Sequence, residues 1–374
     1  MLKKISLPLL LSLALLTAGW LFLSRLARAD VNNDQYLPLL SDGRPLPPLP
    51  PPVPLTSTLP LDVPALTTEL AAQGQVLALG KIGFHVGIPG NLTGLEDWMV
   101  AMDNAGIPFF LKSVDYPDPL VTAQTLAQTS GISHTLVFRR SGLGYDLPDY
   151  NLPPATAAQL HWLHHKLAFP AQLDPSLVWL ETINEVDKNR AEWLGEFALE
   201  TAQLALADGY RWAAFGWSSG EPEPEHWESP AVIQFLQLAA EHPDQLAIAI
   251  HEYSYLRDDI ANLYPYLVGR FQSLFQICDR YGIPRPTILI TEWGWEYQDV
   301  PTPTDALADI AWASWLYAAY PEVRGAAIWY LGYGYGNIAD QAQQLIAPLT
   351  EYNLHNYFSR TPGVGSVDPA LFTP

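Results

Sequence analysis

Short apolar runs alternate with amphipathic segments along most of the chain. Eight of the runs have the length of β-strands and are nearly continuous in Val, Ile, Leu, Phe and Ala, which is typical of parallel strands buried on both faces. They are predicted at residues 81–86, 108–114, 134–139, 177–184, 211–217, 246–251, 287–291 and 325–331. Between them, apolar residues recur at intervals of three and four, as in amphipathic helices; one such stripe consists of Leu95, Trp98, Met99 and Met102.

Glycines mark the ends of several of these helical segments, at Gly106, Gly209 and Gly282. A strand followed by a helix, eight times, predicts a (β/α)8 TIM barrel of the α/β class; an open, doubly wound sheet is the alternative. Polar and aromatic residues gather after many different strands, which favours the barrel because its strands converge on one mouth. We expect a single barrel domain at residues 75–360 and a C-terminal tail at 361–374.

The first 29 residues have the pattern of a targeting segment. Lys3 and Lys4 precede an uncharged apolar run at residues 5–24, and Ala27 and Ala29 offer a small-x-small cleavage site. The run is also long enough to span a bilayer. Residues 1–29 are therefore predicted to be a cleaved signal peptide or an N-terminal membrane anchor, and both alternatives predict an extracellular or cell-surface protein.

Residues 30–74 are predicted to form a linker, because nine of the twenty residues from 45 to 64 are proline. Such a stretch favours an extended polyproline II conformation over packing into a core. We interpret it as a spacer between the membrane or cell wall and the folded domain.

Composition narrows the range of partners. The formal net charge of −20 disfavours nucleic acid, anionic membranes and polyanionic substrates, whereas a neutral carbohydrate is compatible with it. The single cysteine, Cys278, excludes internal disulfides, so stability must come from the core, for which 49% hydrophobic residues provide ample material. We expect a monomer.

Two of the predicted strands end on a glutamate, Glu185 and Glu292. A carboxylate at the tip of a buried strand is costly to desolvate, so two in matching positions indicate chemistry rather than packing. Two carboxyl groups about 5–5.5 Å apart, one protonated and one ionised, can serve as general acid and nucleophile at a glycosidic bond with retention of configuration. The pattern predicts that Glu185 and Glu292 form such a pair.

The chain resembles the large clan of retaining glycoside hydrolases with (β/α)8 barrels, whose acid/base and nucleophile lie at the ends of strands four and seven. Glu185 falls on the fourth predicted strand and Glu292 on the seventh, and Asn184-Glu185 matches the Asn-Glu pair of that clan. The resemblance implies that Asn184 hydrogen-bonds the 2-hydroxyl of the sugar at the cleavage point. It also implies hydrolysis by double displacement without metal or cofactor.

Further positions match the cellulase-like family 5 and its neighbours. His251 and Tyr253 lie two residues apart, hence on one side of the sixth strand. The resemblance implies that the tyrosine donates its hydroxyl to the nucleophile and that the histidine lines the sugar site. It makes Trp329 the floor of that site, and flat aromatic faces suit pyranose rings. Trp217 and Trp293 are candidates for lining further subsites.

The match departs from the clan in two places. Asn-Glu-Pro, frequent on strand four, is Asn-Glu-Val here. Where many members place an arginine beside the nucleophile, the second strand offers Lys112; Arg139 or Arg140 at the end of strand three are alternatives. The sequence leaves these three open.

Other chemistries are weaker hypotheses. His161 and His165 lie one helical turn apart, a spacing that can chelate a metal, but helices lie outside a barrel, and we expect no metal. A barrel that binds glycans without turnover is the main alternative to an exported retaining glycosidase acting on a neutral polysaccharide or oligosaccharide. A lyase or aldolase using Lys112 as a Schiff-base amine is a third.

Overall fold

The computed structural model describes residues 54–88, 90–256, 259–363 and 365–372. The predicted targeting segment at 1–29 and the linker as far as residue 53 lie outside this range. None of the helices within it is long and apolar enough to cross a bilayer.

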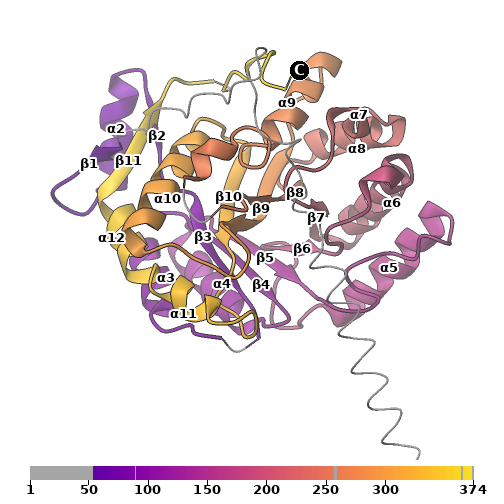
Figure 1. Ribbon diagram of the computed structural model, residues 1–374, viewed down its shortest axis with the longest axis horizontal. Helices are drawn as coiled ribbons and strands as arrows, with labels where there is room; N and C mark the ends of the chain where they lie inside the picture. The colour runs from indigo at the N-terminus through magenta and orange to yellow at the C-terminus, as the bar shows by residue number, and fades with distance from the viewer. Residues whose placement is uncertain (1–53, 89, 257–258, 364, 373–374) are drawn as a thin grey trace, which may run out of the picture. The chain divides into compact units, whose positions relative to one another are not determined.

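Eight parallel strands close into a barrel in the order β10-β3-β4-β5-β6-β7-β8-β9, and helices surround it (Figure 1). This confirms the predicted (β/α)8 fold. The strands are β3 (Ile82–Val86), β4 (Phe110–Val114), β5 (Thr135–Arg139), β6 (Val178–Glu181), β7 (Arg211–Trp217), β8 (Leu246–Tyr253), β9 (Thr287–Gly294) and β10 (Val323–Ile328).

Segments of amphipathic pattern form the helices, and among the described residues left-handed glycines end three of them: Gly131 at φ 81°, Gly209 at φ 77° and Gly282 at φ 65°. The helices around the barrel are α3 (Leu95–Asn104), α4 (Asp118–Ser130), α5 (Pro154–Ala168), α6 (Ala191–Asp208), α7 (Pro224–Trp227), α8 (Pro230–Glu241), α9 (Phe271–Tyr281), α10 (Pro303–Ala318), α11 (Ile338–Gln343) and α12 (Ile346–His355). In the described part of the chain, the short 3-10 helices η1 (Lys188–Arg190) and η2 (Ile260–Leu263) lie in the loops.

The main core lies between strands and helices, and a second, smaller apolar cluster fills the inside of the barrel. The inner cluster consists of Phe110, Val137, Trp179, Ala213, Ala247, Ala249, Leu289 and Ala327. Since side chains two residues apart on a strand share a face, the inward positions nearer the strand ends follow directly from these. On β4, β5, β6, β8 and β9 those positions carry polar side chains, which form the site described below, whereas β7 has Phe215 and β10 leads to Trp329.

The end of the predicted linker is corrected by the structure. Residues before the barrel form β1 (Leu55–Thr56), α2 (Val63–Ala72) and β2 (Val76–Ala78), and β1 and β2 pair with β11 (Asn356–Arg360) in a three-stranded antiparallel sheet. Leu61 and Leu70 are buried. The proline-rich composition misled here because Pro64 lies in the first turn of α2, where proline is tolerated, behind an Asp62 cap.

Gly365 and Asp368 of the C-terminal segment hydrogen-bond to α9 and to the loop that follows it. Gln276 Nε2 donates to the Asp368 carbonyl at 2.6 Å, and Arg285 Nη1 donates to the Gly365 carbonyl at 2.5 Å. The predicted tail is therefore attached to the barrel by side-chain hydrogen bonds.

Candidate active site

A layer of polar side chains lies inside the barrel, directly above the inner apolar cluster. Lys112 follows Phe110 by two residues, Arg139 follows Val137, Glu181 follows Trp179, and His251 follows Ala249, so each points inward. In register, His85 lies beside Lys112, Arg139 beside Glu181, and His251 beside Glu292. Six ionisable groups thus meet at the carboxyl end of the strands, where barrel enzymes hold their chemistry.

Glu292 lies near the end of β9, and its residue is only 7% exposed. Tyr253 donates its hydroxyl to Glu292 Oε2 at 2.8 Å, and Lys112 Nζ lies 3.4 Å from Oε1. Burial opposes ionisation, but the positive charges of His251 and Lys112 outweigh it and hold the pKa of Glu292 well below its usual range. Glu292 is therefore ionised at neutral pH, as a nucleophile must be.

Lys112 is shared between two carboxylates. Its Nζ lies 2.7 Å from Glu181 Oε2, and both side chains are fully buried. Thr291 donates its hydroxyl to Glu181 Oε1 at 2.7 Å. Burial opposes ionisation of Glu181, yet the charge of Lys112 outweighs it and lowers the pKa of this carboxyl.

Of the three basic residues that the sequence left open, Lys112 contacts Glu292. Arg139 is buried at the end of β5, with Nη1 4.0 Å from Asp146 Oδ1. Arg140 is about half exposed and pairs with Asp115 rather than with Glu292.

Glu185 lies just beyond β6, which ends at Glu181 rather than at residue 184 as predicted. Its backbone is left-handed, with φ 47°, and its N–H donates to the Gly216 carbonyl at 2.8 Å. About half of its side chain is exposed, in contrast to Glu292. This conformation holds the carboxylate over the mouth of the barrel.

The electrostatics of Glu185 differ from those expected of a resting general acid. The pKa of this carboxyl is lowered overall. Burial acts to raise it, but the hydrogen bond with His251 and the charge of that ring outweigh burial. A general acid needs a raised pKa. Because the side chain is half exposed, a ligand that covers it would remove water and raise the pKa.

His251 joins the two glutamates. Its Nδ1 lies 3.4 Å from Glu185 Oε1 and 3.7 Å from Glu292 Oε2. These two carboxylate oxygens are therefore at most about 7 Å apart, a limit that accommodates the spacing of about 5–5.5 Å found in retaining pairs.

Asn184 and Trp329 lie beside this centre. The Asn184 N–H donates to the Asp146 carbonyl at 2.8 Å, while its Oδ1 is buried without a hydrogen-bond partner among the described residues, so it can accept from a ligand. The Trp329 ring is half-buried and stands edge-on to Tyr253, with centroids 6.2 Å apart.

Tyrosines that the sequence analysis missed extend this aromatic surface. Tyr297 stacks on Trp329 at 6.1 Å, and Tyr335 meets it edge-on at 4.7 Å. Tyr255 stacks on Tyr253 at 6.2 Å. Tyr255, Tyr297 and Tyr335 each expose 45% or more of their surface, so their faces are accessible to a ligand.

Two predicted subsite residues are in the wrong place. Trp293 is fully buried and Trp217 is 1% exposed, so neither can stack on a sugar. Trp293 packs against Trp295 at 5.0 Å, and Trp217 against Trp227 at 5.9 Å. Thr291 and Glu292 both point inward, at a bulge where β9 shifts register against β8 and β10, so Trp293 points outward into the core beneath the helices.

The two helical histidines have structural partners. His161 Nε2 contacts the Thr182 carbonyl at 2.7 Å, and His165 Nε2 contacts the Tyr145 carbonyl at 3.1 Å. Within the described ranges, no group of three or more His, Cys, Asp or Glu residues is arranged to hold a metal ion.

No known protein family matches the chain, and no curated protein does either. Among solved structures, it is similar to a thermostable, halotolerant GH5 cellulase from an Icelandic hot spring isolate, with 14% identity over 68% of this chain and 75% of that one, and a TM-score of 0.33. It is also similar to the YdjI aldolase from Escherichia coli K12, with 9% identity over 79% of this chain and 96% of that one, and a TM-score of 0.33.

A third similar structure is a mutant tryptophan synthase α-subunit from Pyrococcus furiosus, with 10% identity over 75% of this chain and 99% of that one, and a TM-score of 0.33. Likenesses this distant accompany different chemistries and do not choose among them. The barrel is a fold typical of enzymes, and the reaction has to be argued from the site itself.

Proposed function

We propose that this chain is an exported retaining glycoside hydrolase that cleaves β-glycosidic bonds in a neutral polysaccharide or oligosaccharide. In this proposal Glu292 is the nucleophile and Glu185 the general acid/base. The observation that carries it is the placing of both carboxylates against one histidine nitrogen, with oxygens at most about 7 Å apart. Their contrast in burial supports the division of roles, because the buried one is held ionised and the exposed one can meet a leaving group.

The first step forms a covalent intermediate. Glu292 Oε attacks the anomeric carbon while the bond to the leaving oxygen breaks, and Glu185 transfers its proton to that oxygen. Tyr253 and Lys112 orient the attacking carboxylate through the contacts described above. Trp329 supplies an apolar surface for the sugar ring, and Asn184 Oδ1 an acceptor for one of its hydroxyls.

The second step releases the sugar. Glu185, now ionised, removes a proton from water, whose oxygen attacks the anomeric carbon and displaces Glu292. Two inversions at one carbon give net retention. Each glutamate returns to its starting protonation state, so the cycle needs no redox partner.

Variants of the two glutamates test the proposal. Glu292→Ala is expected to abolish hydrolysis of an aryl β-glycoside, whereas Glu185→Ala retains slow turnover because an activated leaving group needs little protonation. Added azide should restore turnover of Glu185→Ala and give a β-glycosyl azide. It should also restore turnover of Glu292→Ala, but there the product should be an α-glycosyl azide. Glu296→Ala, an exposed carboxylate four residues beyond Glu292, is the matched control and should retain parental activity.

Parental rates in both glutamate variants would show that neither carries the chemistry. Binding of glycans without turnover by the parental protein would favour the non-catalytic glycan-binding barrel instead. The Schiff-base alternative is disfavoured by the position of Lys112, whose amine is fully buried and faces two carboxylates.

A further inference from the structure

A cavity of about 640 Å³ lies at the opposite end of the barrel from the glutamate pair. Its floor is formed by residues at the starts of strands, among them Phe110, Thr135 and Arg211, whereas the candidate active site lies at the strand ends. Residues of α2 and β2, the segment before the barrel, form its cover. Ligand sites in proteins commonly have volumes of about 300–1,000 Å³.

The lining of this cavity is basic, although the chain as a whole carries a charge of −20. One acidic residue, Asp244, faces four basic ones: Lys81, Arg211, Arg324 and Arg360. A local excess of positive charge on so acidic a protein attracts anions to this end of the barrel.

Neutral carbonyl groups hold most of these basic side chains. Lys81 Nζ donates to three carbonyls at 2.7 to 3.1 Å, Arg211 Nη1 to the Leu177 carbonyl at 3.4 Å, and Arg360 Nη1 to those of Thr361 and Gly363. Carbonyls orient these groups without cancelling their charge.

The ion pair on the lining is weak. Arg324 Nη2 lies 3.2 Å from Asp244, but the Asp244 side chain is 80% exposed and solvent screens the pair. Burial is the main cause that lowers the pKa of Lys81 to about 7, with the charges of Arg360 and Arg324 adding to it and Glu322 opposing it. Arg211, Arg324 and Arg360 therefore carry most of the positive charge of the lining at neutral pH. An anion at this end would relieve the repulsion.

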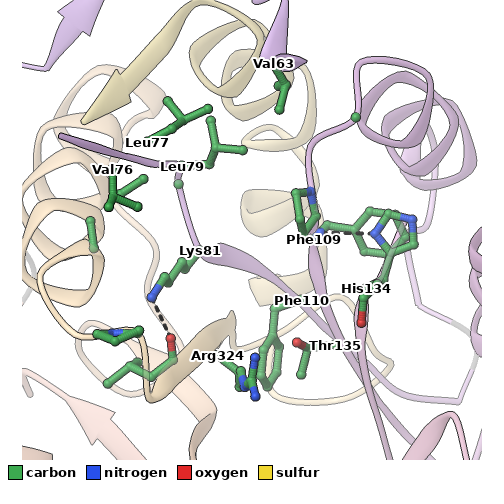
Figure 2. A pocket seen from close by; sticks show the side chains of 18 of the residues that line it. Val63, Val76, Leu77, Leu79, Lys81, Phe109, Phe110, His134, Thr135 and Arg324 are labelled. Atoms are coloured by element: carbon green, nitrogen blue, oxygen red, sulfur yellow. Dashed lines mark hydrogen bonds between the residues drawn. The ribbon is translucent and has the colours of Figure 1, made fainter. Parts of the chain in front are cut away.

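The other end of the cavity is apolar. Figure 2 shows Val63, Val76, Leu77 and Leu79 gathered at one end and Arg324 at the other. The four apolar side chains are only half-buried, so they leave surface that a ligand could cover. The cavity is therefore amphipathic.

We propose that this cavity is a second binding site, for a small amphipathic carboxylate whose head lies against Arg324 and Arg211 and whose apolar body lies against Val63, Val76 and Leu77. The planar guanidinium groups suit a carboxylate, which can accept two parallel hydrogen bonds from one of them. The site lies apart from the glutamate pair and is independent of the hydrolase proposal.

Calorimetric titration of the whole protein with octanoate tests the site. Octanoate is expected to bind, octanamide of the same length to bind at least about tenfold more weakly, and inorganic phosphate, which lacks the apolar body, also more weakly. Arg324→Gln and Arg211→Gln should each weaken octanoate about tenfold, as expected when one charge-assisted hydrogen bond is lost. Arg280→Gln, which removes a basic residue paired with Glu228 outside the cavity, is the matched control.

Thermal unfolding of each variant verifies that it is folded. Equal affinity for octanoate and octanamide, or parental affinity in both cavity variants, would overturn the proposal. So would octanoate that inhibits aryl glycoside hydrolysis competitively, since that places it at the barrel mouth. Because binding is measured without turnover, an inactive parental protein would leave this result intact and contradict only the hydrolase proposal.

Discussion

Lys112→Met is the most informative single perturbation of the polar layer. The Lys112 amine lies 2.7 Å from Glu181 and 3.4 Å from Glu292, and the Lys112 and Glu181 side chains are wholly buried. Replacing Lys112 by methionine leaves two buried carboxylates without the positive charge that they face. We expect this to lower the free energy of unfolding by about 3–5 kcal/mol. For a domain of this size we expect the melting temperature to fall by on the order of 10 °C at neutral pH.

The loss should depend on pH in a defined direction. In the parental protein the pKa of Glu181 is lowered below its unfolded value of about 4.3, so this carboxyl stabilises the fold above that pH and less as pH falls through the lowered pKa. Without Lys112, the largest charge that opposes burial is gone; Arg139 and His251 still lower the pKa, but we expect burial to outweigh them and raise the folded pKa. The same carboxyl then opposes folding as pH rises above about 4.3, so the variant's deficit shrinks from pH 7 towards pH 5.

Urea unfolding followed by tryptophan fluorescence at both pH values measures this. Lys166→Met is the matched control, because its pair with Asp208 is short, at 2.6 Å, but solvent-exposed. It should cost less than about 1 kcal/mol at either pH. A Lys112→Met deficit no larger than that of the control, or one of equal size at both pH values, would refute the reasoning.

Three further outcomes are expected. Tyr253→Phe removes the hydroxyl bonded to the nucleophile, so kcat on an aryl glycoside should fall about ten- to a hundredfold, and the acidic limb of kcat/KM should move to higher pH; an unmoved limb contradicts the contact. Burial raises the pKa of Glu252 in the folded protein to about 7, above the value of about 4.3 in the unfolded chain. The free energy of unfolding therefore falls as the pH rises from about 4.3 to 7. Glu252→Gln should therefore flatten the dependence of unfolding free energy on pH between 5 and 8, and an unchanged slope argues against it. Leu61→Ala should lower the free energy of unfolding in urea by about 2–4 kcal/mol because Leu61 is buried, whereas Leu59→Ala should lower it little because Leu59 is 72% exposed. Equal losses in the two variants would mean that this segment is an unpacked linker.

The barrel and the position of its two glutamates could be predicted because both depend on patterns of residues that are close together in the sequence. Continuous apolar runs of strand length gave the eight strands, and a glutamate at the end of such a run is conspicuous by its cost. The outward position of Trp293 was not available from alternation alone. Leu289 and Thr291 face the inside of the barrel, so strict alternation would place Trp293 there too, and only the register shift in β9 turns it outward. Alternation does find Glu181, two residues beyond Trp179.

What the sequence could not supply is contact across the barrel. Lys112 on β4 and Glu181 on β6 are separated by β5 in the sheet, and their side chains meet only because the closed barrel brings inward residues together. The choice of Lys112 over Arg139 depends on that geometry. The basic residues of the cavity, Arg211, Arg324 and Arg360, come from three distant segments of the chain, so no local sequence motif predicts this cavity.

The left-handed backbone of Glu185 has a consequence for how this protein can vary. A glutamate at φ 47° costs on the order of 1 kcal/mol that glycine would not, so the fold alone prefers glycine at this position. A library of residue 185 variants selected only for heat resistance should therefore drift to glycine or asparagine, whereas one selected for turnover should keep glutamate. Stability and turnover therefore favour different residues at position 185. The residue found there in related sequences shows which of the two properties has been selected.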